Sequence, residues 1–178
     1  MTTLYLIRHG TTNSNLAGVF QGSMDVPLNE RGLSQAALLA RRFEKVHLDK
    51  IYVSALQRAR QTGEALAKGR GLEVQVMPLL NEIDLGEMEG HTGQECRQLF
   101  PQAVQDLEEN TAWFQAPGGD VYKRQAGYIP VDGSDHKLFL LADLQRFVIH
   151  RGKYYIDTGT GGAGLRGKIA VEQIDPRV

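Results

Sequence analysis

Two basic side chains and a glycine stand together near the start of the chain, as Arg8-His9-Gly10. An imidazole nitrogen is nucleophilic near neutral pH, because the reference pKa of histidine is about 6.5. A neighbouring guanidinium can hold two phosphate oxygens at once, and a glycine lets the backbone approach a substrate closely. These residue types favour phosphoryl transfer to His9. A histidine that only packs or caps at the end of a strand would show the same three letters.

Two further segments carry side chains that suit the same chemistry. Arg58 stands in the run 54–62, near a predicted helix start, where the free backbone N–H groups favour an anion. Arg58 could therefore clamp the same phosphate, whereas a solvated basic helix face explains Arg60 equally well. Glu82 is one of four acidic residues spread over residues 80–90, and a carboxyl group there could protonate a leaving oxygen. Solvation at the surface is the alternative for any one of these acids.

Alternating strand and helix patterns supply the elements that would position these side chains. Short apolar runs predict strands at 4–7, 51–53 and 74–77, and apolar residues at spacings of three and four predict helices between and after them. Ser54 and Gln57 form a capping-box pattern that predicts a helix start. This order predicts an α/β fold, a parallel-sheet sandwich with helices on both faces. Catalytic side chains emerge where such strands end.

Composition narrows the class of protein. The 178 residues suit one domain, 42% of them are hydrophobic, and the formal charge of −1 gives no electrostatic footprint for nucleic acid. The single cysteine, Cys96, fits a reducing compartment. We find no signal-peptide pattern and no apolar run of about 20 residues, so we expect a cytoplasmic protein without a membrane partner. The oligomeric state stays open.

Four motifs in sequence resemble those of one family. Residues 6–15 are similar to the nucleophile motif of the histidine phosphatase (phosphoglycerate mutase-like) superfamily. Residues 20–22 and 27–32 look like the segment that follows it, and the motifs around Arg58 and Glu82 come in the family's order. The resemblance covers roughly residues 3–119.

The resemblance implies a phosphoglycerate mutase-like fold and a phosphohistidine intermediate on His9. It implies Arg8 and Arg58 as phosphate clamps and Glu82 as the proton donor. It also implies three substrate-binding positions: Asn15, Gln21 and Gly22. It implies no metal and no organic cofactor. The implied substrate is a small phosphorylated metabolite, which a phosphatase would hydrolyse; a phosphoglycerate mutase is the alternative.

The resemblance breaks down in the last third of the chain. The family's second histidine, in a motif of the type Val-Ser-His-Gly, is missing, and His150 is the nearest approach. Residues 120–125, Asp-Val-Tyr-Lys-Arg-Gln, are similar to the translation of a transposon-end adaptor used in sequencing libraries. We therefore expect a truncated core at 1–119, with the fold incomplete beyond it, and an unassigned, foreign tail at 120–178.

A foreign tail would not have been selected to cover the sheet, so we expect residues 120–178 to pack poorly and the chain to be an inactive fragment. A natural family variant with an unusual tail is the alternative. Gly162–Gly167 has the spacing of a dinucleotide-binding loop, but a glycine-rich loop explains it better.

Overall fold

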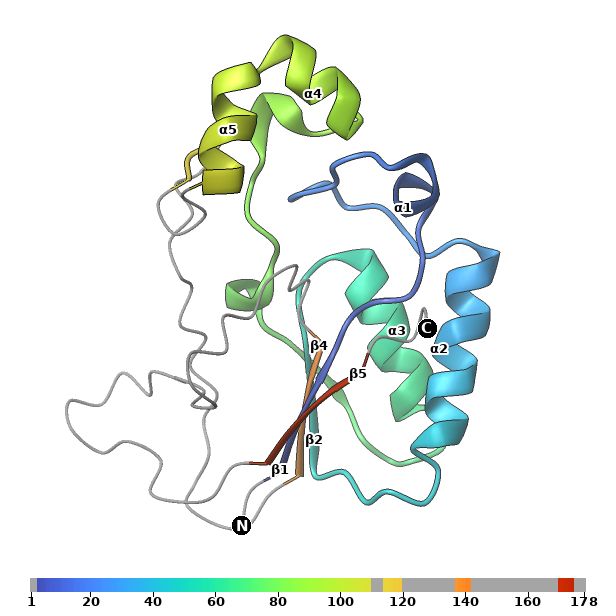
Figure 1. Cartoon of the computed structure of the whole chain (residues 1–178). Coiled ribbons are helices and arrows are strands. Elements are labelled where there is room, and N and C mark those ends of the chain that lie inside the picture. The colour runs from blue at the N-terminus through green and yellow to red at the C-terminus, as the bar shows by residue number, and fades with distance from the viewer. Residues whose placement is uncertain (1–2, 110–113, 120–136, 142–169, 175–178) are drawn as a thin grey trace, which may run out of the picture.

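The computed structural model of the chain describes residues 3–109, 114–119, 137–141 and 170–174 (Figure 1). The strands are β1 (Thr3–Ile7), β2 (Lys50–Val53), β3 (Val74–Val76), β4 (Lys137–Leu141) and β5 (Ala170–Ile174). The helices are α1 (Asn13–Ala17), α2 (Glu30–Arg42), α3 (Gln57–Ala67), α4 (Gly93–Leu99) and α5 (Pro101–Glu109), with 3-10 turns η1 (Pro78–Leu80) and η2 (Gly86–Met88). The strands form one parallel sheet in the order β3-β2-β4-β1-β5, which confirms the predicted α/β fold.

Large apolar side chains of β1 and β2 pack against the helices. Ile7 of β1 and both Ile51 and Val53 of β2 are at most 2% exposed, and they pack against Leu39 of α2 and Leu66 of α3. Fully burying one such side chain stabilises the fold by about 1.5–3 kcal/mol. This cluster therefore fixes β1 and β2, the two strands whose carboxyl ends lead into the Arg8-His9 and Arg58 motifs.

β4 and β5 come from the part of the chain that we expected to pack poorly. β4 lies between β1 and β2 and pairs in parallel with both, and β5 pairs in parallel along the other side of β1. Residues 137–141 and 170–174 thus pair through their backbones with β1, one strand on each side of it, and the expectation of poor packing stays a prediction. The adaptor-like residues 120–125, the glycine-rich loop 162–167 and His150 lie outside the described residues.

Helices α2 and α3 lie side by side against one face of the sheet (Figure 1). α2 begins at Glu30, where the side chain of its N-cap Asn29 accepts a hydrogen bond from the Gly32 N–H at 2.9 Å. α3 begins at Gln57 after Leu56, and no side chain at that N-cap position makes a capping bond. The predicted capping box of Ser54 and Gln57 is therefore wrong.

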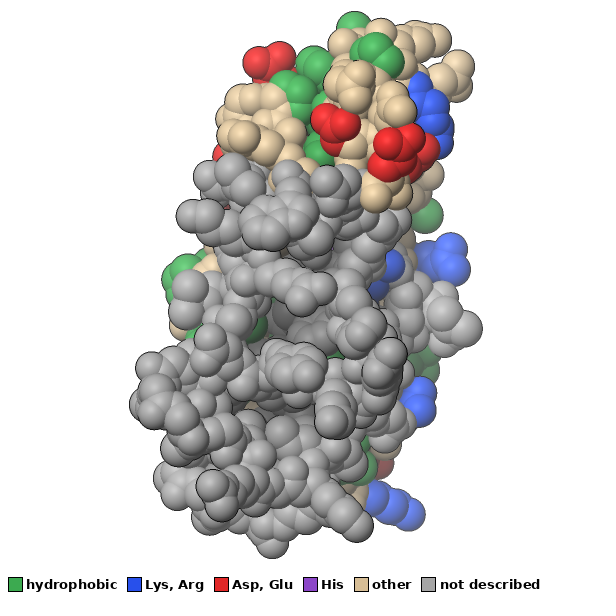
Figure 2. Space-filling model, turned by 60° about the vertical axis from the view of Figure 1, so that its left-hand side comes forward, with side chains coloured by type: hydrophobic (Ala, Val, Ile, Leu, Met, Phe, Trp, Pro, Cys, Tyr) green, Lys and Arg blue, Asp and Glu red, His purple; other side chains and the backbone are tan. Residues whose placement is uncertain are grey.

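A second lobe stands above the carboxyl edge of the sheet (Figure 1). Its helices α4 and α5 enclose a separate apolar cluster that includes Met88, Cys96 and Phe114. Thr92 and Glu95 form a capping box at the start of α4. Acidic side chains gather on this lobe with a basic side chain beside them, and other Lys and Arg side chains lie lower along the margin of the same view (Figure 2). None of the described helices is long and apolar enough to cross a membrane.

Candidate active site

His9 lies two residues beyond the end of β1, at the carboxyl edge of the sheet. Its side chain is 4% exposed, and its Nδ1 lies 2.6 Å from the carbonyl oxygen of Gly10. Because a carbonyl oxygen can only accept a hydrogen bond, Nδ1 carries the proton. The lone pair of the neutral ring is then on Nε2. This tautomer suits an imidazole that attacks an electrophile through Nε2.

Gly10 is required by packing. A Cβ on Gly10 would stand 2.6 Å from the carbonyl oxygen of Gly32, in the first turn of α2. The glycine thus lets the backbone after His9 approach a helix, whereas the sequence suggested an approach to substrate. The Gly10 N–H donates to Thr62 Oγ1 at 3.2 Å, and that hydroxyl donates to the Arg58 carbonyl oxygen at 2.7 Å. A single hydroxyl therefore joins the nucleophile's turn to α3.

Arg58 is held in place at the N-terminus of α3. Its side chain is 1% exposed, and its two terminal nitrogens donate to the carbonyl oxygens of Met24 at 2.6 Å and Gly22 at 2.8 Å. Arg8 is half-buried and directly precedes His9. The fold thus places one arginine beside the histidine and a second on the helix bonded to the histidine's turn.

Gly22 takes part in the site through its backbone. It has a φ of 48°, and a Cβ there would overlap the carboxylate of Glu89. Its carbonyl oxygen faces Arg58 at 2.8 Å. A residue with a side chain would disturb both the left-handed turn and the contact with Glu89.

Asn15 and Gln21 meet at the hydroxyl of Thr12. Thr12 Oγ1 lies 2.8 Å from Gln21 Oε1 and 3.1 Å from Asn15 Oδ1, and it also accepts the Asn15 N–H as the N-cap of α1. Thr12 is fully buried and Gln21 is 4% exposed. The two predicted substrate-binding side chains are thus brought together, three residues after His9, in a network that orders the loop around it.

Glu82 lies just after η1, in the segment that follows β3 at the same edge of the sheet. It is half-buried, and its Oε1 accepts the Ile83 N–H at 3.1 Å. The preceding residue, Asn81, accepts the Ala55 N–H at 2.7 Å. That bond ties the Glu82 segment to the loop that leads from β2 into α3, the helix that carries Arg58.

Four polar residues around the site were missed by sequence reasoning: Thr62, Asp25, Gln35 and Glu89. Gln35 Oε1 accepts both the N–H and the hydroxyl of Thr11 at 2.9 Å, and Asp25 Oδ1 accepts the Gln57 N–H at 2.6 Å. Each bond joins residues at least 24 positions apart. A pattern of neighbouring residues cannot show which distant residues form a hydrogen bond. Glu89 was nevertheless one of the four acidic residues noted around Glu82.

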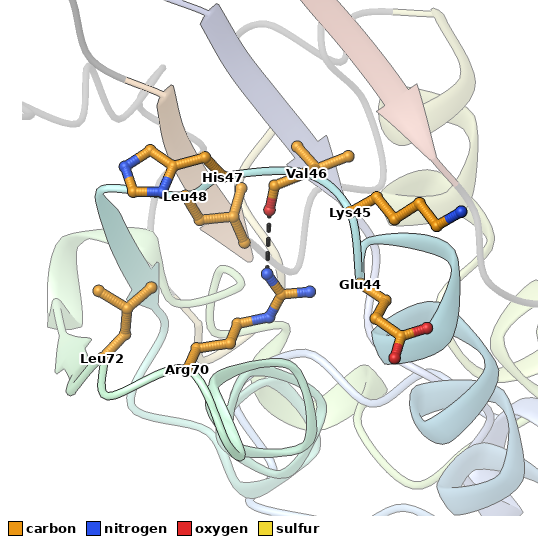
Figure 3. A pocket seen from close by; sticks show the side chains of 7 residues that line it. All are labelled: Glu44, Lys45, Val46, His47, Leu48, Arg70 and Leu72. Carbon is orange, nitrogen blue, oxygen red and sulfur yellow. Dashed lines mark hydrogen bonds between the residues drawn. The ribbon is translucent and has the colours of Figure 1, made fainter.

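A cavity of about 410 Å³ lies far from these residues, at the amino ends of β2 and β3. Arg70 reaches across it to the Val46 carbonyl oxygen at 3.0 Å, while the side chains of Lys45 and His47 point away from each other (Figure 3). Side chains that point apart cannot hold one phosphate together. We therefore place the candidate site at His9 because of its side chains, and not at the cavity. In the described part of the chain, no group of three His, Cys, Asp or Glu side chains could hold a metal ion.

Comparison with known proteins bears on the same stretch. The profile of the histidine phosphatase superfamily (branch 1) matches residues 4–126. Phosphoserine phosphatase 1 of Hydrogenobacter thermophilus is 35% identical over 133 residues, which are 72% of this chain and 63% of that protein. Adenosylcobalamin/alpha-ribazole phosphatase of Escherichia coli is 36% identical over 110 residues, 62% of this chain and 51% of that protein.

A plant relative and a solved structure extend the comparison. Phosphoglycerate mutase-like protein 4 of Arabidopsis thaliana is 33% identical over 141 residues, 75% of this chain and 61% of that protein. The structure of Bacillus stearothermophilus YhfR superposes with a TM-score of 0.69 at 31% identity, covering 79% of this chain and 74% of that one. The chain thus spans roughly half to two-thirds of the length of the curated relatives named here.

Proposed function

The chain belongs to the histidine phosphatase superfamily, and from that premise we propose that it carries the phosphoryl-accepting site of a phosphomonoesterase for small phosphorylated metabolites. The observation that carries the proposal is the 2.6 Å contact of His9 Nδ1 with the Gly10 carbonyl, which leaves the lone pair on Nε2. In the neutral imidazole of this tautomer, Nε2 is the nitrogen whose lone pair can attack phosphorus.

Each predicted site residue takes one role in this proposal. His9 Nε2 attacks the phosphorus, the bond to the leaving oxygen breaks, and Glu82 gives that oxygen its proton. Arg8 and Arg58 hold the phosphate oxygens, whose negative charge they balance in the transition state. Water then attacks the phosphohistidine, which releases inorganic phosphate and frees His9. Asn15, Gln21 and Gly22 line the substrate side of the loop.

The names of the relatives support a hydrolase over a mutase. Two of the three relatives named above are phosphatases by name: a phosphoserine phosphatase and an adenosylcobalamin/alpha-ribazole phosphatase. The phosphoglycerate mutase-like relative supports an alternative function, in which the phosphoryl group passes to another hydroxyl of the substrate. We further propose a cytoplasmic location, and a division of the chain into a phosphatase core at 1–119 and a foreign tail at 120–178.

Trapping the phosphoenzyme tests the proposal. The full chain, mixed with a ³²P-labelled phosphomonoester and quenched in base, should retain label that acid removes, as a phosphohistidine does. His9→Ala should abolish the label. His47→Ala, an exposed histidine at the opposite edge of the sheet, is the matched control and should keep it. Label that survives in the His9 variant would refute the assignment.

A further inference from the structure

Glu89, just after η2, receives hydrogen bonds from two separate segments of the site. Its Oε1 accepts the Ser23 N–H at 2.6 Å, the Ser23 hydroxyl at 3.0 Å and the Leu85 N–H at 3.0 Å. Hydrogen bonds to an ionised acceptor are shorter and roughly twice as strong as neutral ones. A single carboxylate oxygen therefore fastens residue 23 to the segment that runs from Glu82 to Glu89.

Ser23 stands between the two residues that hold Arg58. The carbonyl oxygens of Gly22 and Met24 accept the two terminal nitrogens of the Arg58 guanidinium. The Gly22 carbonyl and the Ser23 N–H belong to the same planar peptide unit, so the hydrogen bond to Glu89 sets the position of the Gly22 acceptor directly. The Met24 carbonyl lies two peptide units further along the same short loop. Gly22 lacks a Cβ at the point where one would overlap the Glu89 carboxylate, so the close approach is built into the loop.

We propose that Glu89 is a positioning residue for the phosphate clamp: it holds the 22–24 loop so that Arg58 points at the phosphate. The inference rests on the proposed role of Arg58 in binding phosphate. Through the Leu85 N–H, three residues after Glu82, the same carboxylate also sets the distance between the clamp and the proposed acid. Glu89 touches no substrate in this arrangement and acts through Arg58.

Binding of inorganic phosphate to the full chain gives a direct test that needs no turnover. Glu89→Ala should raise the dissociation constant for phosphate about tenfold, measured by calorimetry, because the guanidinium loses its fixed direction. Glu89→Gln keeps an oxygen acceptor of the same shape and should stay within about threefold of the native chain. Glu87→Ala, an exposed acid two residues away, is the matched control and should change nothing.

A double-mutant cycle separates positioning from loss of fold. If Glu89 acts through Arg58, then Glu89→Ala should cost little further affinity in a chain that already carries Arg58→Ala. Amide hydrogen exchange of the native chain and the Glu89→Ala variant adds a structural measurement. The Ser23 and Leu85 amides should exchange at least about tenfold faster in the variant, while the amides of β1 and β2 keep their rates.

The outcomes distinguish this inference from the proposed function. Unchanged phosphate affinity in Glu89→Ala, or equal losses with and without Arg58, would overturn the positioning role even if the chain is an active phosphatase. A coupled loss of affinity in a chain that forms no phosphohistidine would support the positioning role and refute the proposed chemistry.

Discussion

Thr62 shows how much of this site depends on one buried hydroxyl. It accepts the Gly10 N–H and donates to the Arg58 carbonyl oxygen, and its side chain is fully buried. Removing it leaves a buried backbone N–H with no acceptor, which costs about 1–3 kcal/mol. We expect Thr62→Val, which keeps the shape, to lower the free energy of unfolding by that amount in urea. It should also weaken phosphate binding.

Thr62→Ser restores the hydroxyl and should recover most of both losses. If valine and serine behaved alike, methyl packing rather than the hydrogen bonds would explain the position. The sequence places Thr62 one turn after Arg58, but it could not reveal Gly10 as the second partner, because that contact joins residues 52 positions apart.

Gly10 gives a second prediction for a single residue. A methyl group there would stand 2.6 Å from the Gly32 carbonyl oxygen, which is closer than real Cβ contacts. Gly10→Ala must therefore push the turn after β1 away from α2, and we expect it to lower the free energy of unfolding by about 1–3 kcal/mol. Gly93→Ala is the control, because the nearest atom to its added Cβ is 3.9 Å away on a flexible side chain. Equal thermal stability of the two variants would contradict this account.

The start of α3 shows why an element can be predicted correctly while its boundary is not. The apolar spacing predicted the helix, and the capping-box pattern placed its start at Ser54, three residues before Gln57. The cap comes instead from another part of the chain: Asp25 accepts the Gln57 N–H at 2.6 Å and its side-chain amide at 3.1 Å. A pattern confined to neighbouring residues cannot report an acceptor 32 positions away.

This cap should make the stability of the chain depend on pH. The hydrogen bond from the Gln57 N–H, more than the nearby charges of Arg60 and Arg58, holds the pKa of Asp25 below its ordinary 3.8. A carboxylate whose pKa is lower in the folded chain stabilises the fold at pH values above its unfolded-state pKa. That stabilisation is lost as the pH falls through the folded-state pKa. The side chain is exposed, so we expect Asp25→Ala to cost about 1 kcal/mol or less at pH 7.

Thermal unfolding from pH 7 down to pH 2 measures this dependence. The difference in melting temperature between the native chain and Asp25→Ala should stay constant to about pH 4 and shrink below it. A difference that grew toward low pH would mean that the carboxylate is not the stabilising form.

At the scale of the whole molecule, the sequence predicted the first three strands, the parallel sheet and the order of the motifs. It predicted them because short buried strands and amphipathic helices leave local periodicities. It could not place β4 between β1 and β2, since that pairing joins residues more than 80 positions apart and neither strand encodes its partner. The same reasoning explains the missed site residues, whose partners come from distant segments.

The last prediction concerns turnover by the chain as a whole. Histidines in the described residues other than His9 do not reach the site: His47 lines the cavity at the opposite edge, and His91 packs against Phe100 with ring centroids 6.1 Å apart. The family resemblance implies a second histidine beside the phosphate, and losing one donor that stabilises transition-state charge costs about 10²–10³ in kcat. We therefore expect the purified 178-residue chain to bind phosphate but to hydrolyse nitrophenyl phosphate at least about 10²-fold more slowly than Escherichia coli alpha-ribazole phosphatase assayed beside it. Equal rates would contradict a foreign tail, and their loss in His150→Ala would assign that histidine to the site.

Sequencing the source DNA across codons 118–127 checks the junction independently, because an adaptor origin requires the reading GAT GTG TAT AAG AGA CAG at residues 120–125.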